Sequence, residues 1–447
     1  EFALRYEPLD LCVLGALFHE ERAHVAMREA LVRWLATTPS SQFARIAGHL
    51  FEWLTGTLLD YTLPAGAKRV PVLDEAAYFT GPAVRIAKWG VVHNLLGSRH
   101  MAPIVRRTPA LAAVDARTLA ARLGDIISSI DPGILHRALS YLYLAETQSS
   151  FAIEKEIPDH HRREAFRRLL EQAGSPGRFA EEVVVTWHRA IITQPLRQEM
   201  GYRTKQNWLS RGSSIHAAVD YVPPSPAHVH EMMEGVADLA QQGADSSVDP
   251  VIAAACSAFG FVFVHPFLDG NGRLHRFLLH HILRQAGVSP EGVVLPLSVA
   301  LEANLADYGA VLQRYSSPRT RVLDYRLDPD TNTIHVRGEQ PEWLYGFFDA
   351  TEICELIWRC IERALSRDLP AELAWLRAYD SAMTRLGFWL DGAQAELDLL
   401  VRLVVQNHGR LSKNKRGHFD RFTDEEIAKA EAQIREAFIE WEEKFAT

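Results

Sequence analysis

Apolar residues recur every three to four positions over long parts of the chain, and this spacing predicts amphipathic helices. We expect the first third of the chain to be entirely helical. A nearly uncharged apolar run at residues 251–264 is shorter than the roughly 20 residues that cross a bilayer, so it predicts a buried core helix. Helical spacing covers residues 10–59, 126–144 and 161–172 and resumes at 350, and a capping box at Thr423 and Glu426 starts the last helix.

Two segments depart from this pattern and predict small β-hairpins. In residues 202–221, the runs KQNWLS and SIHAAVDY flank a turn at residues 211–213, and two prolines follow at 223 and 224. A weaker signal lies at residues 322–336, around Asp328, Pro329 and Asp330. The predicted fold class is therefore mainly α with one or two small hairpins.

Composition narrows the class of protein. The 447 residues are 47% hydrophobic and 23% charged, which excludes a disordered chain, a collagen and a small disulfide scaffold. A net charge of -8, from 48 basic and 56 acidic residues, gives no overall attraction to nucleic acid or to a membrane surface. The 4 cysteines are scattered, so we expect them to be reduced. No secretory signal opens the sequence, and we expect a cytoplasmic protein.

Residues 265–276, with the sequence HPFLDGNGRLHR, hold the groups that can carry chemistry. Gly270 and Gly272 flank Asn271 just before a predicted helix. Such a loop can turn tightly and direct several N–H groups at one anion beside the positive end of the helix. Arg273 and Arg276 are three residues apart and can bind further phosphate oxygens. The pattern predicts a site for a phosphate ester or a nucleotide.

Three more residues of this segment complete the predicted site. Asp269 supplies the carboxylate that Mg²⁺ requires beside a nucleotide phosphate. His265, at the end of the buried helix, can take the proton of an incoming hydroxyl. Phe267 lies between them, and we expect it to point inward and anchor the loop. A glycine-rich turn alone is weak support for phosphate binding, but the base, the acid, the turn and the arginines together have no common structural explanation.

The segment matches the signature of the Fic family, HxFx(D/E)GNGRxxR, at every specified position. The resemblance implies a Fic-type helical core with a β-hairpin flap, and adenylylation, in which AMP passes from Mg²⁺-ATP to a Ser, Thr or Tyr hydroxyl of a protein. It also implies the roles of the residues. His265 would be the general base and Asp269 the Mg²⁺ ligand. The anion hole would be formed by Gly270, Asn271 and Gly272, and the β- and γ-phosphates would be bound by Arg273 and Arg276.

A second resemblance concerns regulation. Some Fic proteins carry an inhibitory helix with the pattern (S/T)xxxE(G/N), whose glutamate pairs with the second arginine of the signature. Residues 150–155, SFAIEK, fit this pattern at Ser150 and Glu154 and depart from it at Lys155. Because such a pair would be partly buried, the loss of one partner is costly enough to act as a switch. We therefore expect autoinhibition through Glu154.

The resemblance also suggests an organisation of the whole chain. We expect an N-terminal helical region at residues 1–115, a Fic core with the inhibitory segment and flap at 116–340, and a C-terminal helical extension at 341–447. The flap, residues 207–221, would hold the target protein by strand pairing. The expected partner is a protein, which could be the chain itself; nucleic acid and membrane are not expected partners, and homodimerisation is left open.

Other functions remain to be weighed against AMP transfer. The same site could remove AMP, or transfer another nucleotide or a phosphate group. The loop retains the full GNGR form, which favours nucleotidyl transfer over the kinase-like reaction of the Doc branch. A third possibility is a regulatory binding protein that only senses a nucleotide, and the intact signature argues against it.

Overall fold

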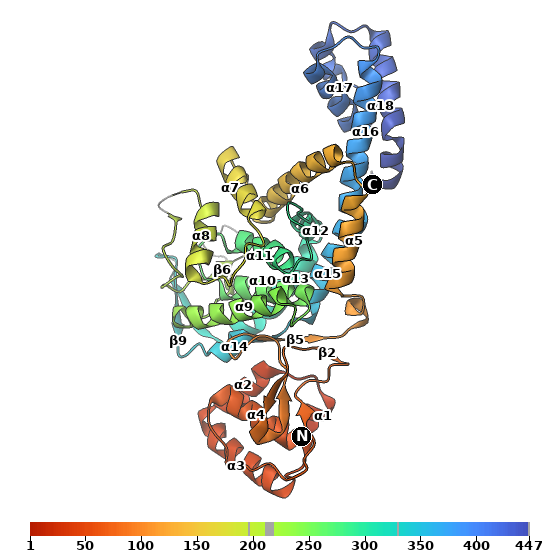
Figure 1. The fold of residues 1–447 in the computed structure, drawn as a ribbon. Helices are drawn as coiled ribbons and strands as arrows, with labels where there is room; N and C mark the ends of the chain where they lie inside the picture. Colours follow the sequence, from red (N-terminus) through yellow and green to blue (C-terminus); the bar gives the residue numbers. More distant parts are fainter. Residues whose placement is uncertain (195–196, 211–218, 329, 446–447) are drawn as a thin grey trace.

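The computed structural model describes residues 1–194, 197–210, 219–328 and 330–445, with the backbone alone at residues 21–24. Most of these residues lie in helices, and short strands form four small sheets among them. The mainly α fold class is therefore confirmed. Figure 1 shows the N-terminal helices at one end of the molecule, a central group, and the C-terminal helices at the other end.

The N-terminal helices pack around a small apolar core that includes Phe18, Leu35 and Phe51. Asp10 caps the second helix by accepting a hydrogen bond from the backbone N–H of Val13 at 2.9 Å. The helices predicted within residues 10–59 are confirmed. They follow a short first helix, and the four are α1 (Phe2–Tyr6), α2 (Leu11–His19), α3 (Glu21–Thr37) and α4 (Gln42–Thr55).

Short strands occupy much of residues 70–106, so the expectation of an entirely helical first third is wrong. Gly90 and Gly97 adopt φ angles of 57° and 71°, and such left-handed turns recur too closely for a helix to form. The strands are β1 (Val70–Pro71), β2 (Tyr78–Phe79), β3 (Val84–Ile86), β4 (Val91–His93) and β5 (Ala102–Arg106).

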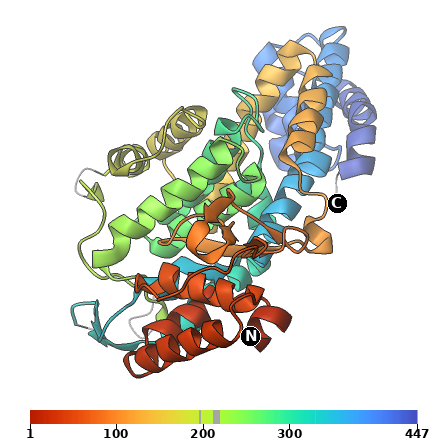
Figure 2. The ribbon, with the colours of Figure 1, turned by 60° about the horizontal axis from the view of Figure 1, so that its bottom comes forward.

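Strand β5 joins distant parts of the chain. It pairs antiparallel with β2 and parallel with β10 (Phe347–Asp349), while β4 lies between β1 and β3. Figure 1 shows β2 and β5 between the N-terminal helices and the central helices, and in Figure 2 the N-terminal helices again lie at one edge of the molecule. The N-terminal region is thus tied to the central group by backbone pairing.

The residues predicted as helical at 126–144 belong to two helices, α5 (Ala116–Ser128) and α6 (Pro132–Ile153). Asp131 separates them and caps α6, accepting hydrogen bonds from the N–H groups of Gly133 at 2.9 Å and Ile134 at 3.2 Å. Helix α6 ends immediately before Glu154, and this end positions the predicted inhibitory segment.

The central group is built around α10 (Pro250–Val264). Nearly all of its side chains are buried, and it packs against α9, α11 and α15, so the predicted core helix is confirmed. The other helices of this group are α7 (His160–Glu171), α8 (Glu181–Ile191), α9 (Val229–Ala244), α11 (Asn271–Gln285), α12 (Leu297–Ala303), α13 (Leu305–Val322), α14 (Glu342–Gly346) and α15 (Thr351–Arg363).

Both predicted hairpins have paired strands. In the first, β6 (Leu209–Ser210) pairs antiparallel with β7 (Val219–Tyr221); its predicted turn at residues 211–213 lies outside the described residues. In the second, β8 (Asp324–Asp328) pairs with β9 (Thr333–Arg337), and Pro329 also lies outside the description.

The C-terminal helices have an apolar core of their own, which includes Leu400, Phe419 and Ile434. The capping box is confirmed: the N–H of Glu426 donates to Oγ1 of Thr423 at 3.2 Å, and the Thr423 N–H donates to Oε2 of Glu426 at 2.7 Å. The helices are α16 (Leu369–Gly387), α17 (Gln394–Gln406) and α18 (Asp424–Phe445).

Packing connects the predicted domains. The central apolar cluster continues from Phe79 to Leu376, so it includes residues on both sides of positions 115 and 340. The boundaries 1–115, 116–340 and 341–447 stay predictions. Among the described residues, no helix combines the length and the apolar character that a membrane crossing requires.

Candidate functional site

The segment at residues 265–276 folds as a loop between two buried helices. His265 ends α10 in a left-handed conformation, with φ 53°, and its N–H still donates to the Phe261 carbonyl at 3.0 Å. Gly270, with φ 84°, precedes the first residue of α11. The two left-handed residues reverse the chain within a short distance, so the loop lies at the N-terminus of α11.

An internal clamp fixes this loop. The side chain of Asn271 accepts from the Phe267 N–H at 3.1 Å and donates to the Phe267 carbonyl at 2.8 Å. The Phe267 ring is fully buried and stacks on His188, with ring centroids 4.1 Å apart. The inward orientation expected for Phe267 is confirmed, and the loop is held at both its backbone and its apolar side.

His265 is neutral at physiological pH. Burial is the largest effect and lowers the pKa of its imidazole. The hydrogen bond with the Val262 carbonyl raises the pKa, the charge of Arg203 lowers it, and the charges of Glu154 and Asp269 raise it, so that the net value is about 4. Its Nδ1 lies 3.2 Å from the Val262 carbonyl, which can only accept, so Nδ1 carries the proton. Nε2 is therefore unprotonated and can accept a proton.

Arg203 holds the backbone around His265. Its guanidinium donates to the carbonyls of His265 at 2.8 Å, Pro224 at 2.6 Å and Lys205 at 3.1 Å. The Arg203 N–H donates to the Pro266 carbonyl at 2.8 Å. Burial lowers the pKa of this guanidinium to about 10, so it remains charged at neutral pH. Sequence reasoning missed this residue, because no local pattern marks an arginine that acts on a loop far along the chain.

The two arginines of the segment are buried beside the N-terminus of α11. Their side chains are 2% and 1% exposed for Arg273 and Arg276. Within the described part of the chain, Nε and Nη1 of Arg273 are buried without a hydrogen-bond partner. Buried donors of a charged group are costly to leave unpaired, so a ligand with several anionic oxygens fits this site.

Asp269 lies at the edge of the same site, with its side chain 42% exposed. One carboxylate oxygen accepts from the Gly270 N–H at 2.6 Å and from Arg273 Nη2 at 3.2 Å. The other oxygen is 3.9 Å from Arg197 Nη1. Mg²⁺ prefers one or two carboxylates, several waters and phosphate oxygens, and an exposed carboxylate next to an anion site fits this preference.

The predicted inhibitory residues both contact Arg276. Ser150 accepts from Nε of Arg276 through its hydroxyl at 2.8 Å and from Nη2 through its carbonyl at 2.7 Å. Glu154 forms an ion pair with Nη1 at 3.0 Å, and its own side chain is 37% exposed. Ser150 thus holds two nitrogens of this guanidinium by hydrogen bonds, and Glu154 lies beside the third as its counter-charge.

Glu154 also fills the space in front of Gly272. A Cβ atom at Gly272 would lie only 2.0 Å from Oε1 of Glu154, so a side chain at this position would displace the carboxylate from its place. The carboxylate therefore lies directly beside the glycine-rich turn as well as beside Arg276. An anion bound to the turn and to Arg276 would compete with it for the same groups.

Lys155 and Glu156 complete the segment. Lys155 is exposed and left-handed, with φ 57°, which is a conformation that glycine and asparagine adopt more readily. Glu156, which the sequence analysis did not single out, pairs with Arg162 and lies 3.7 Å from Nη1 of Arg273. The two carboxylates of residues 154–156 therefore lie near both arginines of the signature.

His188 and Glu199 support the loop from outside and were also missed. His188 Nε2 lies 3.2 Å from the Asp269 carbonyl, and Glu199 accepts from the Leu268 N–H at 2.7 Å. The flap is adjacent: Asn207 donates to the Phe267 carbonyl at 3.3 Å, just before β6. Only the fold brings these residues to the loop, since each is far from it in sequence.

Comparison with known proteins identifies the family of this region. Residues 178–283 match the Fic/DOC family. A protein adenylyltransferase fic-1 from Caenorhabditis elegans is 32% identical over 132 residues, 28% of this chain and 24% of the relative. A protein adenylyltransferase Fic from Nematostella vectensis is 32% identical over 108 residues, 24% of this chain and 23% of the relative. The matches thus span about a quarter of the length of these curated relatives.

Solved structures give weaker likenesses. A Fic family protein from Desulfovibrio desulfuricans covers 75% of this chain and 89% of its own, with 18% identity and a TM-score of 0.39. Fic-1 from Caenorhabditis elegans covers 81% of this chain and 90% of its own, with 17% identity and a TM-score of 0.36. The sequence match and the signature, which lies wholly inside the matched region, identify residues 178–283 as a Fic domain.

Proposed function

We propose that this chain is a protein adenylyltransferase, which transfers AMP from ATP to a Ser, Thr or Tyr hydroxyl of a protein. One observation carries the proposal: a complete Fic signature folds into a loop that places a neutral histidine and two buried arginines around the N-terminus of one helix. The curated relatives named protein adenylyltransferases support the reaction type.

In this proposal the phosphates of ATP bind at the start of α11. The N–H groups of Gly270, Asn271 and Gly272 would face the phosphates, and the partial positive charge of the helix N-terminus favours such an anion. Arg273 and Arg276 would bind the β- and γ-phosphates with the donors that are now unpaired or held by residues 150–154. Asp269 would hold Mg²⁺, which supplies charge neutralisation for the phosphates.

His265 would act as the general base. Its low pKa keeps Nε2 free to accept a proton at neutral pH, while Nδ1–H remains bonded to the Val262 carbonyl and fixes the ring. The hydroxyl oxygen of the target attacks the α-phosphorus, the bond to the bridging oxygen breaks, and pyrophosphate leaves. Arg203 is a positioning residue in this step, since it holds the carbonyl of His265 and does not reach the reacting atoms.

Autoinhibition is the second part of the proposal. Glu154 would exclude the γ-phosphate from Arg276 while Ser150 holds the other donors of that guanidinium. Removal of one partner of a fully buried ion pair costs about 3–5 kcal/mol. Because Glu154 is partly exposed, solvent reduces this to about 1–2 kcal/mol, which corresponds to roughly 5- to 30-fold in the population of the open site.

Removal of AMP is the alternative that one contact favours. The Glu154 carboxylate is partly exposed and lies beside Gly272, where it could direct a water molecule at a phosphorus held by the turn. In that reaction Glu154 would be required rather than inhibitory. A regulatory binding protein, the third candidate, would form no covalent product, so neither His265 nor Glu154 would have a catalytic role in it.

The expected partner is a protein, with the flap of β6 and β7 pairing with its backbone, and self-modification is the simplest case. Homodimerisation stays open, and a cytoplasmic location stays a prediction of the sequence analysis.

A labelling experiment separates these reactions. Glu154→Gly would be incubated with Mg²⁺ and ATP that carries a label on either the α- or the γ-phosphate. AMP transfer labels protein from the α-position only, whereas phosphate transfer labels it from the γ-position only. Protein labelled by neither, with intact ATP binding, would overturn the proposal of AMP transfer and leave removal of AMP or nucleotide sensing.

A further inference from the structure

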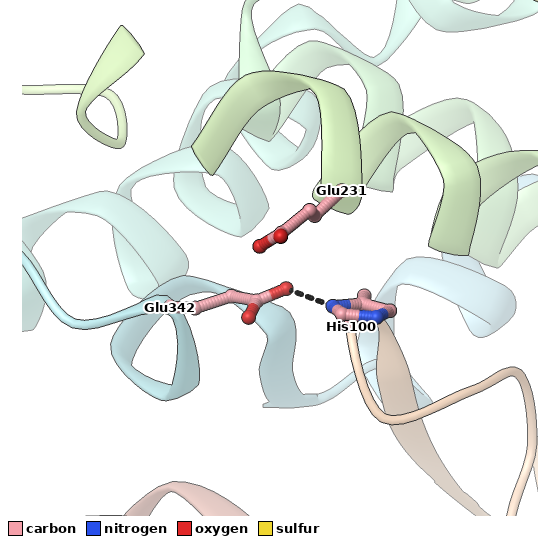
Figure 3. A group of neighbouring side chains, drawn as sticks. All are labelled: His100, Glu231 and Glu342. Atoms are coloured by element: carbon pink, nitrogen blue, oxygen red, sulfur yellow. Dashed lines mark hydrogen bonds and ion pairs between the residues drawn. The ribbon is translucent and has the colours of Figure 1, made fainter. Parts of the chain in front are cut away.

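One histidine and two glutamates converge at a second place, on elements that contribute nothing to the predicted nucleotide site. One ligand atom from each of His100, Glu231 and Glu342 lies within 4.8 Å of the others. Figure 3 shows the three side chains pointing toward one another from separate elements: the turn before β5, the first turn of α9 and the start of α14. Nδ1 of His100 is 2.5 Å from Oε1 of Glu342.

The backbone holds these three elements in close contact. A Cβ atom at Gly346 would lie 2.5 Å from the His100 carbonyl oxygen, and one at Gly235 would lie 3.1 Å from the His100 carbonyl carbon. Each glycine is four residues after one of the glutamates, so it lies one turn further along the same face of its helix. Glycines therefore allow α9 and α14 to approach the His100 turn closely, which fixes the separation of the three side chains.

The turn that carries His100 is itself rigid. Ser98 and Met101 exchange two backbone hydrogen bonds, at 2.9 and 3.1 Å, and Gly97 before them is left-handed. The Met101 side chain is fully buried. A ligand set held by packed backbone loses little conformational freedom when it binds an ion, and this is the usual basis of a preformed site.

The charges at this place favour a cation. The Glu231 and Glu342 carboxylates each bring a negative charge, and their ligand atoms lie within 4.8 Å of each other. These two carboxylates repel each other, while Nδ1 of His100 lies within hydrogen-bonding distance of Glu342. A divalent cation would remove this repulsion.

We propose that His100, Glu231 and Glu342 form a zinc site. One imidazole nitrogen and two carboxylate oxygens suit Zn²⁺, which binds such ligands at roughly 2.0–2.2 Å, with water in the fourth position. Two ligands of one tetrahedral ion are roughly 3.3 Å apart, so the His100 and Glu342 side chains separate by less than 1 Å on binding. Nδ1 then donates its lone pair to the ion and the ring proton resides on Nε2.

The ion would join three distant parts of the chain. His100 lies before the region that matches the Fic/DOC family, Glu231 within it, and Glu342 after it. Since unfolding would separate the three ligands, bound zinc stabilises the folded chain. The site shares no residue with the signature segment, so the proposal stands or falls independently of AMP transfer.

Zinc content tests the proposal. The full chain would be stripped with a chelator, equilibrated with micromolar Zn²⁺ without nucleotide, and analysed for bound metal and thermal stability. We expect one zinc ion per chain and a midpoint of thermal unfolding that rises by a few degrees. His100→Ala and Glu342→Gln should each weaken zinc binding at least tenfold, whereas Asp269→Ala should leave it unchanged.

Two further variants keep the test decisive. His230→Ala is the matched control, because His230 and Glu181 form an exposed pair at 3.2 Å that resembles His100 and Glu342 without a third ligand. Glu231→Gln changes an exposed side chain and should fold normally, yet lose zinc affinity. The proposal is overturned if the wild type binds no zinc at 100 times the protein concentration, or if Glu231→Gln and His100→Ala bind as much as His230→Ala.

Discussion

Lys155→Gly should tighten the inhibition by Glu154. Lys155 is left-handed, with φ 57°, and this conformation costs a residue with a side chain about 1–2 kcal/mol. Glycine removes that cost, but its larger conformational entropy stabilises the undocked segment by about 0.5–1 kcal/mol. The net effect is about 0.5–1 kcal/mol in favour of the docked segment, so we expect a two- to fivefold lower rate of AMP transfer.

The assay is the initial rate of self-adenylylation, compared with Lys155→Ala. Alanine removes the positive charge and keeps the Cβ atom, so it separates the backbone effect from the charge effect and should not tighten inhibition. Ser246→Gly is the matched backbone control, because Ser246 is also left-handed, with φ 59°, and lies in the turn after α9. It should stabilise the fold without lowering the rate.

A rate for Lys155→Gly that equals or exceeds the wild-type rate would refute this reasoning, provided that Ser246→Gly stabilises the chain as expected. The result would mean that docking of residues 150–156 does not limit the reaction. Equal rates for Lys155→Gly and Lys155→Ala, both lower than wild type, would assign the effect to the charge and also refute the backbone argument.

Three more predictions concern the same site. In the Glu154→Gly background, Arg203→Met should lower kcat for transfer more than tenfold, because Arg203 positions the His265 carbonyl. ATP affinity, measured by calorimetry, should change less than threefold, because Arg203 lies away from the phosphate site. Glu156→Gln should lower the KM for ATP about two- to fivefold, because the Glu156 carboxylate competes with the phosphates for Arg273. The change is modest because Glu156 lies 3.7 Å from Nη1 of Arg273, and Glu164→Gln on α7 should not change the KM. In a pH profile of kcat/KM, activity should persist as pH falls from 7 to about 5.5. The pKa of His265 is lowered to about 4, so the base stays neutral in this range. A loss of activity around the ordinary pKa of histidine would contradict that protonation state.

Local signals were sufficient for much of the fold. The apolar run of α10, the capping box at Thr423 and the paired strands of both hairpins depend on residues close in sequence, and each was predicted correctly. The signature loop could be predicted for the same reason, since its turn and the helix after it are encoded within twelve consecutive positions.

Longer-range pairing accounts for what the sequence could not reveal. Strand β5 is stabilised by β10, more than two hundred residues away, and a five-residue segment has no periodicity that distinguishes it from a loop. The strands that precede it in sequence, β1 to β4, are still shorter. The expectation of an all-helical first third failed here, because apolar spacing alone does not reveal strand partners.

The supporting residues of the site were missed for a related reason. Arg203, His188 and Glu156 act through contacts that exist only after the helices pack. An isolated arginine or glutamate in a polar stretch resembles any exposed residue. Ser150 and Glu154 could be proposed in advance because a family pattern marks them, and their contacts with Arg276 agree with that pattern.

Intact-mass spectrometry after incubation with Mg²⁺ and ATP tests AMP transfer and its inhibition most directly. Wild type, Glu154→Gly, and Glu154→Gly combined with His265→Ala would be compared. We predict a gain of one or more AMP masses that is largest for Glu154→Gly, small for the wild type and absent from the double variant. A wild type modified as fully as Glu154→Gly, modification that survives the loss of His265, or no mass gain in any form would contradict the proposed function.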